Sequence, residues 1–309
     1  MKIRLILNGK SAGKADVRAA VQRLREQGIP LEARVTWEGG DAKRLAVEAC
    51  KDGVERVIVG GGDGSANEVL NGLMTVEPSS RAALAILPLG TANDFATSCG
   101  IPVETLSALK LAAFAAPVAV DVGRANKKFF LNVASGGFGA EVTASTSPEM
   151  KRLLGGGAYS LMGAVMALNF RPYEGRMVLP DKEDTSAAIV GAVGNGRTAG
   201  GGLQVAPLAY IDDGLLDVLV VNQFKIADLG QVVEELSNLS SAGEFVNYSQ
   251  VPWIELESEQ TLPINLDGEP EGFKTVRFEV VPGALKLIVP ADCPLLSGRE
   301  KLPSENRDV

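Results

Sequence analysis

The chain of 309 residues contains no histidine. A Ser-His-Asp triad and a histidine-ligated zinc are therefore excluded, and any general base has to be an Asp, Glu, Lys, Tyr or Cys side chain. The three cysteines, Cys50, Cys99 and Cys293, are too scattered for a zinc site and odd in number, which argues against a disulfide framework. We expect them to be reduced thiols, mostly buried.

Long apolar runs and an excess of positive charge are also missing. No run approaches the roughly 20 residues that a membrane-spanning helix needs. The start, MKIRLILNGK, is not typical of a signal peptide, because its apolar stretch is too short. The formal net charge of −8 disfavours a nucleic-acid partner. These absences predict a cytoplasmic protein, and its length is enough for two domains.

Two loops of small residues follow apolar runs in the first third of the chain. Residues 57–68 are VIVGGGDGSANE, and residues 84–97 are LAILPLGTANDFAT. Each has the sequence form of a strand, a short loop and a helix start, where free N–H groups and the positive end of the helix dipole favour phosphate. Two such loops at the ends of neighbouring parallel strands predict one nucleotide site.

The spacing of these glycines excludes two common phosphate-binding patterns. The dinucleotide fingerprint would need a third glycine at Ser65 or at Asn67. The segment NGKSAGKA at 8–15 is one residue short of a P-loop and has Ala15 where a Ser or Thr belongs. A tight turn without a ligand rarely needs three glycines and an aspartate, so we favour a ligand site.

Apolar periodicity predicts an N-terminal parallel α/β domain, Rossmann-like or phosphofructokinase-like. Strand-like and helical runs alternate there, which is typical of a parallel sheet covered by helices. The expected strands are 2–8, 31–37, 54–60 and 82–88, and the expected helices are 15–27, 41–52, 65–74 and 103–115.

After Asp121 short strand-like runs dominate, and their spacing predicts a C-terminal antiparallel β-sandwich. We place the first domain at residues 1–125 and the second at 126–289. Helical stretches around 148–170 and at 225–240 interrupt the strands. The expected strands are 128–134, 174–179, 187–194, 214–221, 251–257, 261–266, 273–281 and 284–289.

The two loops together resemble the signature pair of the diacylglycerol-kinase-type lipid kinases, and the whole chain resembles the bacterial YegS-type members. Ser65 stands where many relatives have Thr, and it keeps the hydroxyl. Asn8-Gly9 stands where much of the wider family has Asn-Pro. The resemblance continues in order through VTWEGGD at 35–41, NVASGGFG at 132–139, GNGRTAGGG at 194–202, IDDGLLDV at 211–218, INLDGEP at 264–270 and PADCPLL at 290–296.

The resemblance implies an ATP-dependent lipid kinase with its active site in the cleft between the domains. It implies that residues 290–309 return to the first domain. The lipid substrate, phosphatidylglycerol or a diacylglycerol-like lipid, would be met at the membrane surface. ATP is the expected phosphoryl donor, with Mg²⁺ and also Ca²⁺ as candidate cations. The acceptor pocket is expected between the domains, against a helix at 158–170 that carries Leu161, Val165, Met166 and Leu168.

The two loops supply the candidate nucleotide site. We expect backbone amides of the first loop to hold the phosphates, with Ser65 and Asn67 adding side-chain donors. The resemblance implies that Thr36, at the end of an expected strand, also contacts the nucleotide. The candidate residues are Thr36, Gly61, Gly62, Asp63, Gly64, Ser65, Ala66, Asn67, Glu68, Thr91 and Asn93.

The segment LDGE at 266–269 supplies the candidate general base, because phosphoryl transfer to an alcohol needs a carboxylate that accepts the hydroxyl proton. The family points to this motif, and both Asp267 and Glu269 remain candidates for the catalytic role. The other interpretation is a type I′ hairpin, since Asp-Gly between strand-like runs is a strong turn signal. The two interpretations are compatible.

The segment IDDG at 211–214 would on its own be a turn before a strand. The resemblance implies a metal site there, with the carboxylate of Asp213 and the carbonyls of Tyr210 and Leu215 as ligands. Oxygen ligands of this kind suit Mg²⁺ or Ca²⁺. Asp94 is expected either to cap a helix or to join a water-and-magnesium network, and Asp121 could join that network too.

Two other functions remain open. Kinases of soluble small molecules, such as sugars or NAD, share a GGDG loop, but they do not carry PLGTANDFA. A nucleotide-binding regulator without turnover is disfavoured by the intact LDGE segment. Turnover of ATP only in the presence of lipid distinguishes the lipid kinase from both.

Overall fold

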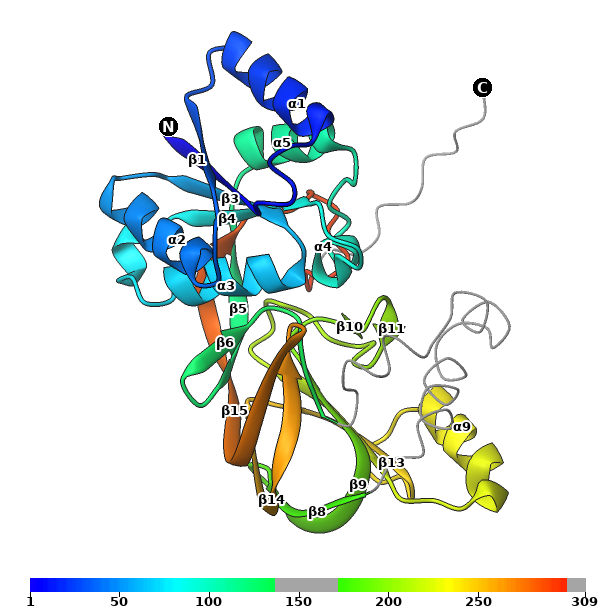
Figure 1. The fold of residues 1–309 in the computed structure, drawn as a ribbon. Helices are drawn as coiled ribbons and strands as arrows, with labels where there is room; N and C mark the ends of the chain where they lie inside the picture. Colours follow the sequence, from blue (N-terminus) through cyan, green and yellow to red (C-terminus); the bar gives the residue numbers. More distant parts are fainter. Residues whose placement is uncertain (137–171, 299–309) are drawn as a thin grey trace, which may run out of the picture.

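The computed structural model describes residues 1–136 and 172–298. The expected helices between 148 and 170, with the acceptor-pocket residues at 158–170, lie outside these residues. Within them, one thirteen-stranded sheet runs through both halves of the molecule. In Figure 1 the parallel part of this sheet, with its helices, is at the top, and the antiparallel part lies below it.

The N-terminal half is the expected parallel α/β domain. Its strands are parallel, in the order β4-β3-β1-β2. The strands are β1 (Ile3–Leu7), β2 (Leu31–Val35), β3 (Arg56–Gly61) and β4 (Ala83–Pro88). The helices are α1 (Ala15–Glu26), α2 (Asp41–Lys51), α3 (Asp63–Leu73), α4 (Asp94–Ser98) and α5 (Thr105–Phe114), with a 3₁₀ turn at Pro78–Ser80.

Helices cover both faces of this sheet because its strands are apolar on both sides. In β3, Ile58 packs in the cluster that contains residues of α1 and α5. Its neighbours Val57 and Val59 pack in the cluster that contains residues of α2 and α3. Because side chains alternate between the two faces of a strand, β3 contributes residues to two cores, one on each face of the sheet.

The C-terminal half is antiparallel, as expected. Its central strands follow the order β13-β12-β9-β7-β14-β15. The strands are β5 (Val118–Ala125), β6 (Lys128–Phe130), β7 (Val133–Gly136), β8 (Tyr173–Val178), β9 (Glu183–Gly194), β12 (Leu216–Asn222), β13 (Val246–Val251), β14 (Trp253–Leu266) and β15 (Glu269–Leu287). A small pair, β10 (Thr198–Ala199) and β11 (Leu203–Gln204), stands apart, and a 3₁₀ turn at Ile226–Asp228 leads into helix α9 (Leu229–Ser237).

Several expected boundaries were wrong. The runs 251–257 and 261–266 form the single strand β14, and the runs 273–281 and 284–289 lie largely in the single strand β15. Each strand continues through a shift of register, between Glu257 and Leu262 in β14 and between Val281 and Leu285 in β15. Such bulges let polar or Pro-Gly residues interrupt the pattern without ending the pairing.

Strand β15 joins the two halves. Its first part pairs with β14, its second part, from Phe278 to Leu287, pairs with β5, and Leu287 also pairs in parallel with Leu84 of β4. Figure 1 shows β15 rising from the lower half into the upper one beside β5. The sheet is thereby continuous across the two halves.

The residues after β15 pack on the first half. Val289, Cys293 and Leu295 belong to the same buried cluster as Leu84. Cys50, Cys99 and Cys293 are all buried, as the sequence led us to expect. Among the helices between residues 1 and 136 and between 172 and 298, none has the length and hydropathy to cross a membrane.

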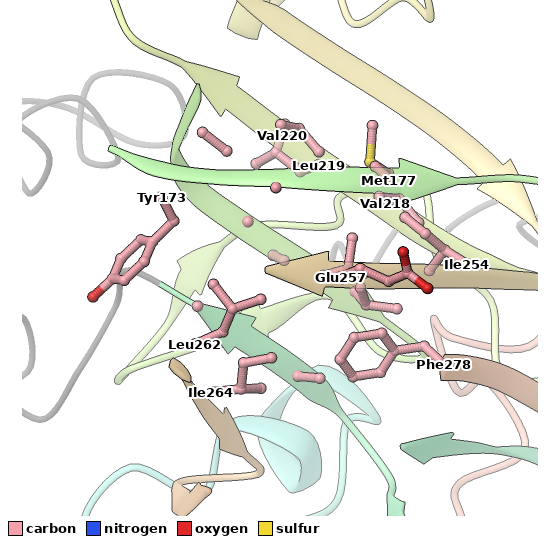
Figure 2. Close-up of a pocket in the computed structure, with 18 of the residues that line it drawn as sticks. Tyr173, Met177, Val218, Leu219, Val220, Ile254, Glu257, Leu262, Ile264 and Phe278 are labelled. Atoms are coloured by element: carbon pink, nitrogen blue, oxygen red, sulfur yellow. The ribbon is translucent and has the colours of Figure 1, made fainter. Parts of the chain in front are cut away.

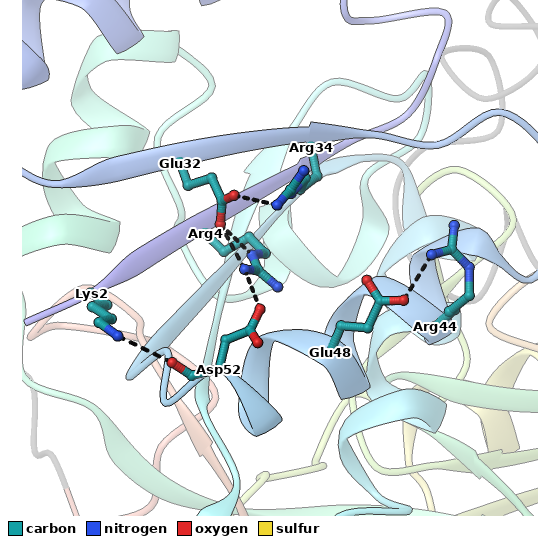
Figure 3. Close-up of polar contacts among 7 residues, drawn as sticks. All are labelled: Lys2, Arg4, Glu32, Arg34, Arg44, Glu48 and Asp52. Atoms are coloured by element: carbon teal, nitrogen blue, oxygen red, sulfur yellow. Dashed lines mark hydrogen bonds and ion pairs between the residues drawn. The ribbon is translucent and has the colours of Figure 1, made fainter.

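A buried arginine fixes the outer edge of the parallel sheet. Arg4 of β1 is 4 % exposed, and its guanidinium donates to Glu32 of β2 and to Asp52 at the end of α2, both at 2.7 Å. Figure 3 shows Arg4 between these two carboxylates, with Arg34 on the outer side of Glu32. One guanidinium therefore links two strands and the end of a helix.

Replacing Arg4 should destabilise the fold more than replacing Arg34. We expect Arg4→Met to lower the free energy of unfolding by about 2 kcal/mol, because two charge-assisted hydrogen bonds of a buried group are lost. Arg34→Met removes an exposed ion pair to the same Glu32 and should cost about 0.5 kcal/mol or less. Urea unfolding of both variants measures the difference. Equal losses would contradict the role of Arg4.

Candidate active site

The two loops predicted from the sequence touch each other at the carboxyl edge of the parallel strands. Strand β3 ends at Gly61, Gly62 caps α3, and Gly90 lies in the loop after β4. A Cβ atom added to Gly90 would lie 2.5 Å from the Cα of Gly62. The loops therefore meet backbone to backbone, which only glycine permits at that distance.

Two of the candidate nucleotide residues shape these loops. The carboxylate of Asp63 accepts the N–H groups of Asp94 at 3.2 Å and Phe95 at 3.3 Å, and so caps α4. Burial raises the pKa of Asp63, and the neighbouring Asp94 raises it further. Asn93 adopts a left-handed conformation, and its side-chain amide accepts from the N–H of Gly90 and donates to the Gly90 carbonyl, both at 2.9 Å.

Two cavities lie around the glycine loop, and both have Gly62, Gly64 and Glu269 in their walls. We call them the lysine-lined cavity and the aspartate-lined cavity. The lysine-lined cavity is lined further by Asn8, Gly39, Lys43, Ser65, Asn67, Glu68, Asn71, Gly90, Lys127, Lys128, Leu266 and Glu271. The aspartate-lined cavity is lined further by Asp63, Thr91, Ala92, Asp94, Asn132, Val133, Ser135, Thr198, Ala199, Gly200, Gly201, Leu203, Asn265, Asp267 and Gly268.

Asp267 is a buried carboxylate surrounded by N–H donors. It lies in the two-residue turn between β14 and β15, where Asp267 (φ 52°) and Gly268 (φ 93°) are both left-handed, as a type I′ turn requires. Its oxygens accept the backbone N–H groups of residues 131–133 at 2.7–3.1 Å and the amide of Asn67 at 3.0 Å. Burial, opposed by these donors, raises the pKa of Asp267 to about 6.

These hydrogen bonds explain why the expected strand 128–134 is split into β6 and β7. The N–H groups of residues 131–133 point to the carboxylate of Asp267 and not to a neighbouring strand. A side chain distant in sequence has thus replaced the ladder partners.

Glu269 differs from Asp267 in its exposure and in its hydrogen bonds, and both properties matter for proton transfer. Its side chain is exposed, and within residues 1–136 and 172–298 it has no hydrogen bond or ion pair. A Cβ atom added to Gly64 would lie 2.5 Å from the Glu269 carboxylate, so this side chain lies directly over the glycine loop. Of the two candidate bases, only Glu269 has oxygen atoms free to accept a proton from a substrate.

Asparagines of α3 bind the second half of the molecule. The amide of Asn67, which was expected to meet phosphate, donates to Asp267 and to the carbonyl of Phe129, both at 3.0 Å. Asn71, one turn later, donates to the same carbonyl at 2.9 Å and accepts from the N–H of Phe129 at 3.0 Å. Asn71 belongs to no motif, and its only sequence signal is the spacing of four residues from Asn67 on a helix face.

The segment 194–202 closes the site from the other side. The carboxylate of Asp94 accepts the N–H of Gly201 at 2.8 Å, and the hydroxyl of Thr198 lies 2.9 Å from that of Ser98 on α4. Asp94 is thus an acceptor for the second half of the chain as well as a first-turn helix residue. Thr91 is exposed and faces the aspartate-lined cavity.

Of the remaining candidate nucleotide residues, Glu68 lines the lysine-lined cavity, whereas Thr36 and Ala66 do not. Thr36 follows β2 at the same sheet edge, and its N–H donates to Leu7 at 2.9 Å. Glu68 of α3 accepts the N–H of Gly40 in the loop after β2. Ala66 is buried in the core under α3. The structure therefore brings the glycine loop, Thr36 and Glu269 to one edge.

Tyr210, Asp213 and Leu215 line neither cavity. Their segment precedes β12 and is held by Asp121, whose two oxygens accept the N–H groups of Gly214 and Gly283, each at 2.7 Å. Asp121 thus uses both oxygens to tie this turn to β15.

Crowded carboxylates make the segment suitable for a cation. Burial raises the pKa of Asp213, and the charges of Asp121 and Asp212 raise it further. Carbonyl and carboxylate oxygens suit Mg²⁺ or Ca²⁺. In the described ranges no three Asp, Glu, Cys or His side chains cluster as metal ligands, so water has to complete any coordination shell. The donors present fit a hydrated cation held by one carboxylate and carbonyls.

An apolar cavity lies on the opposite face of the sheet from the aspartate-lined cavity. In β7, Val133 and Ser135 line the aspartate-lined cavity, whereas Ala134 and Gly136 line the apolar one. Figure 2 shows that aliphatic and aromatic side chains from β8, β12, β14 and β15 surround it. The labelled side chains include Met177, Val218, Ile254, Leu262, Ile264 and Phe278.

The fold and the paired loops define a class of protein. Residues 2–125 match the diacylglycerol kinase catalytic domain, and residues 132–289 match the YegS C-terminal NAD kinase beta sandwich-like domain. A crystal structure described as a diacylglycerol kinase from Bacillus anthracis str. Sterne superposes with a TM-score of 0.73 at 26% identity, covering 94% of this chain and 98% of that one.

Relatives that match over nearly the whole chain define the family within this class. A protein of Chromohalobacter salexigens named "Probable lipid kinase YegS-like" is 54% identical over 294 residues, which are 95% of this chain and 94% of the relative. A protein of the same name from Shewanella frigidimarina is 45% identical over 95% of this chain and 96% of its own length. The chain belongs to the YegS-like lipid kinases of the diacylglycerol kinase catalytic domain family.

The environment of Asp267 leads to a prediction on pH dependence. Between pH 4 and pH 6 the folded protein holds a proton on Asp267 that the unfolded chain has released, so the contribution of this carboxyl to stability falls as pH rises. We expect the free-energy difference between the wild type and Asp267→Asn to shrink by roughly 3 kcal/mol from pH 4 to pH 6 and to stay constant above.

Asp267→Asn should also be destabilising at pH 7, because an amide NH₂ would then face backbone N–H groups that need an acceptor. Urea unfolding of both proteins across this pH range measures the two effects. A silent Asp267→Asn substitution, as a hairpin role alone would give, contradicts the assignment.

Proposed function

We propose that this protein transfers the γ-phosphoryl group of ATP to a hydroxyl group of a lipid. Membership of the lipid kinase family supports the reaction class. The observation that carries the proposal is that the glycine loop and Glu269 form the common wall of two cavities. A phosphoryl group that moves from a donor in one cavity to an acceptor in the other passes this wall.

The lysine-lined cavity is the proposed nucleotide site. Gly64 and Ser65, in the first turn of α3, line it, and the N–H groups at a helix start suit phosphate. Lys43 of α2 and Lys127 beside β6 bring positive charge to the same cavity. Positive charge is needed there because phosphoryl transfer develops negative charge on the phosphate oxygens.

We assign the catalytic base to Glu269 and a positioning role to Asp267. Glu269 is exposed to both cavities, lies over Gly64 and has unused oxygen atoms. It would accept the proton of the lipid hydroxyl as that oxygen bonds to phosphorus. Asp267 is held by four N–H donors and fixes the turn from which Glu269 projects.

Magnesium would accompany the nucleotide and neutralise part of the phosphate charge. The family resemblance places a second, structural cation at Asp213 and the carbonyls of Tyr210 and Leu215. That segment lies against Asp121 and β15, away from the wall shared by the cavities. Its proposed role is therefore to stabilise the junction between the two halves.

The lipid would place its headgroup in the aspartate-lined cavity and an acyl chain in the apolar cavity. The sheet separates the two cavities, and the chain would pass round the end of β7 at Gly136. The apolar cavity supports a lipid acceptor, because a sugar or NAD has no apolar chain that would fill it. Phosphatidylglycerol and diacylglycerol both present a hydroxyl beside acyl chains.

Transfer of labelled phosphate from ATP to lipid in mixed micelles tests the function. We expect turnover that requires lipid and a divalent cation. Glu269→Gln should lower kcat about 100-fold or more, the usual scale for a general base, with little change in the affinity for ATP or in thermal stability. Turnover with sugars or NAD, or ATP binding without any turnover, would overturn the proposal.

Chain length tests the apolar cavity. A Cβ atom added to Gly191 of β9 meets no described atom within 4 Å, so a side chain there extends into open space. Gly191→Phe should therefore lower the turnover of long-chain acceptors about 10-fold and leave that of a short-chain, dispersed diacylglycerol nearly unchanged. Gly191→Ala is the matched control. Equal losses for both chain lengths would argue against chain binding in this cavity.

A further inference from the structure

Trp37 is the most exposed large hydrophobic residue in the described part of the chain. Its exposed fraction is 95 %, against 77 % for Val103 and 58 % for Phe114. The only other tryptophan, Trp253, lies on β14 and has the guanidinium of Arg277 4.0 Å from its ring centroid. Trp37 thus presents both faces of its indole ring to solvent, which suits a planar or apolar partner.

The loop that carries Trp37 is fixed by hydrogen bonds. The carboxylate of Asp41 accepts the N–H groups of Trp37 at 2.8 Å and Glu38 at 3.2 Å, and it also binds the guanidinium of Arg44 at 2.7 Å. The Arg44 bond and these N–H groups lower the pKa of Asp41 to about 2, so the clamp is charged at neutral pH. The exposed ring is therefore held on a well-defined backbone.

Trp37 lies at the sheet edge that carries the proposed nucleotide site. The strands follow the order β3-β1-β2, and neighbouring strands lie about 4.8 Å apart, so the end of β2 is about 10 Å from the glycine loop after β3. The loops between them are in contact, since a Cβ atom added to Gly9 would lie 2.8 Å from the carbonyl oxygen of Thr36. Gly39, two residues after Trp37, lines the lysine-lined cavity.

A nucleotide with its phosphates at the glycine loop has to lay its ribose and base along this edge, because ligands of open α/β sheets lie across the carboxyl ends of the strands. In one direction the edge leads over Asn8 to Thr36 and Trp37. We propose that the indole ring of Trp37 is the stacking surface for the base of the nucleotide. This inference rests on the proposed nucleotide site and names the group that binds the base.

A membrane is the competing partner for an exposed indole. The exposed Glu38 follows Trp37 directly in the chain and would be repelled by an anionic lipid surface, whereas the charge of Asp41 is paired with Arg44. A neutral base stacked on the ring meets no such repulsion. Stacking involves the face of a base and not the hydrogen-bonding groups at its edge. Trp37 should therefore contribute about equally to the affinity for ATP and for GTP.

Fluorescence gives a direct test, since Trp253→Phe leaves Trp37 as the only tryptophan of the full-length protein. We expect ADP and GDP to quench the emission of this variant and inorganic triphosphate to leave it unchanged. In the otherwise wild-type chain, Trp37→Ala should raise the Kd for ADP about 10-fold and leave the Kd for triphosphate unchanged. Trp37→Phe should recover part of the affinity, and Val103→Ala, which removes an exposed side chain outside both cavities, is the control.

Three results would overturn the inference. The first is ADP binding to the Trp253→Phe variant with no change in emission. The second is an equal loss of affinity for ADP and triphosphate in Trp37→Ala, which would mean that the substitution disturbed the loop. The third is a blue shift on adding phosphatidylglycerol vesicles while ADP has no effect, which would assign Trp37 to the membrane. If neither ADP nor triphosphate binds the wild type, the proposed nucleotide site itself fails, which is a separate outcome.

Discussion

The burial of one carboxylate, Asp267, sets the relation between the two halves of this molecule. A buried carboxylate is costly unless donors surround it, and here the donors come from both halves: Asn67 from α3, and the backbone of residues 131–133 from the second half. The backbone donors reach both oxygens, and Asn67 adds a second donor to the Oδ2 atom that the N–H of Leu131 already binds. Moving α3 away from the β14–β15 turn would therefore remove a partner from a charge that water reaches poorly.

The position of Glu269 follows from that constraint. Two residues after Asp267, on the other side of a two-residue turn, its side chain has to project over Gly64. A structural carboxylate and the proposed base thus share one turn. The first is surrounded by N–H groups, and the second is left without partners among the described residues. The rigidity of the turn thus depends on Asp267, and the proposed chemistry depends on Glu269.

Charge at the site differs from charge over the whole chain. The net charge of −8 would repel a nucleotide, but Lys43, Lys127 and Lys128 line the cavity beside the glycine loop. Lys128 is paired with Glu271, and Lys43 and Lys127 balance the charges of Glu68 and Glu269, which line the same cavity. Association with an anion depends on such local arrangements more than on a total.

Local patterns in the sequence were enough to predict the parallel domain, the antiparallel second half and the two loops, because each depends on periodicity or on glycine within a few residues. The role of Asp267 could not be predicted, since its donors lie 134–136 and 200 residues away. For the same reason Asn67 was expected to meet phosphate, whereas its amide binds the second half. Strands β14 and β15 continue through their bulges because they pair with neighbouring strands, and these pairings cannot be seen in the sequence.

Strand β15 makes the two halves inseparable. The catalytic-domain match ends at residue 125, yet the core of the first half also contains Leu285, Leu287 and Leu295, which come from the far end of the chain. A fragment that stopped at 125 would leave β4 with an unpaired edge and an open apolar face. During synthesis the first half can therefore complete its core only after the whole second half has emerged, and evolutionary exchange of either half has to preserve the strand that runs through both.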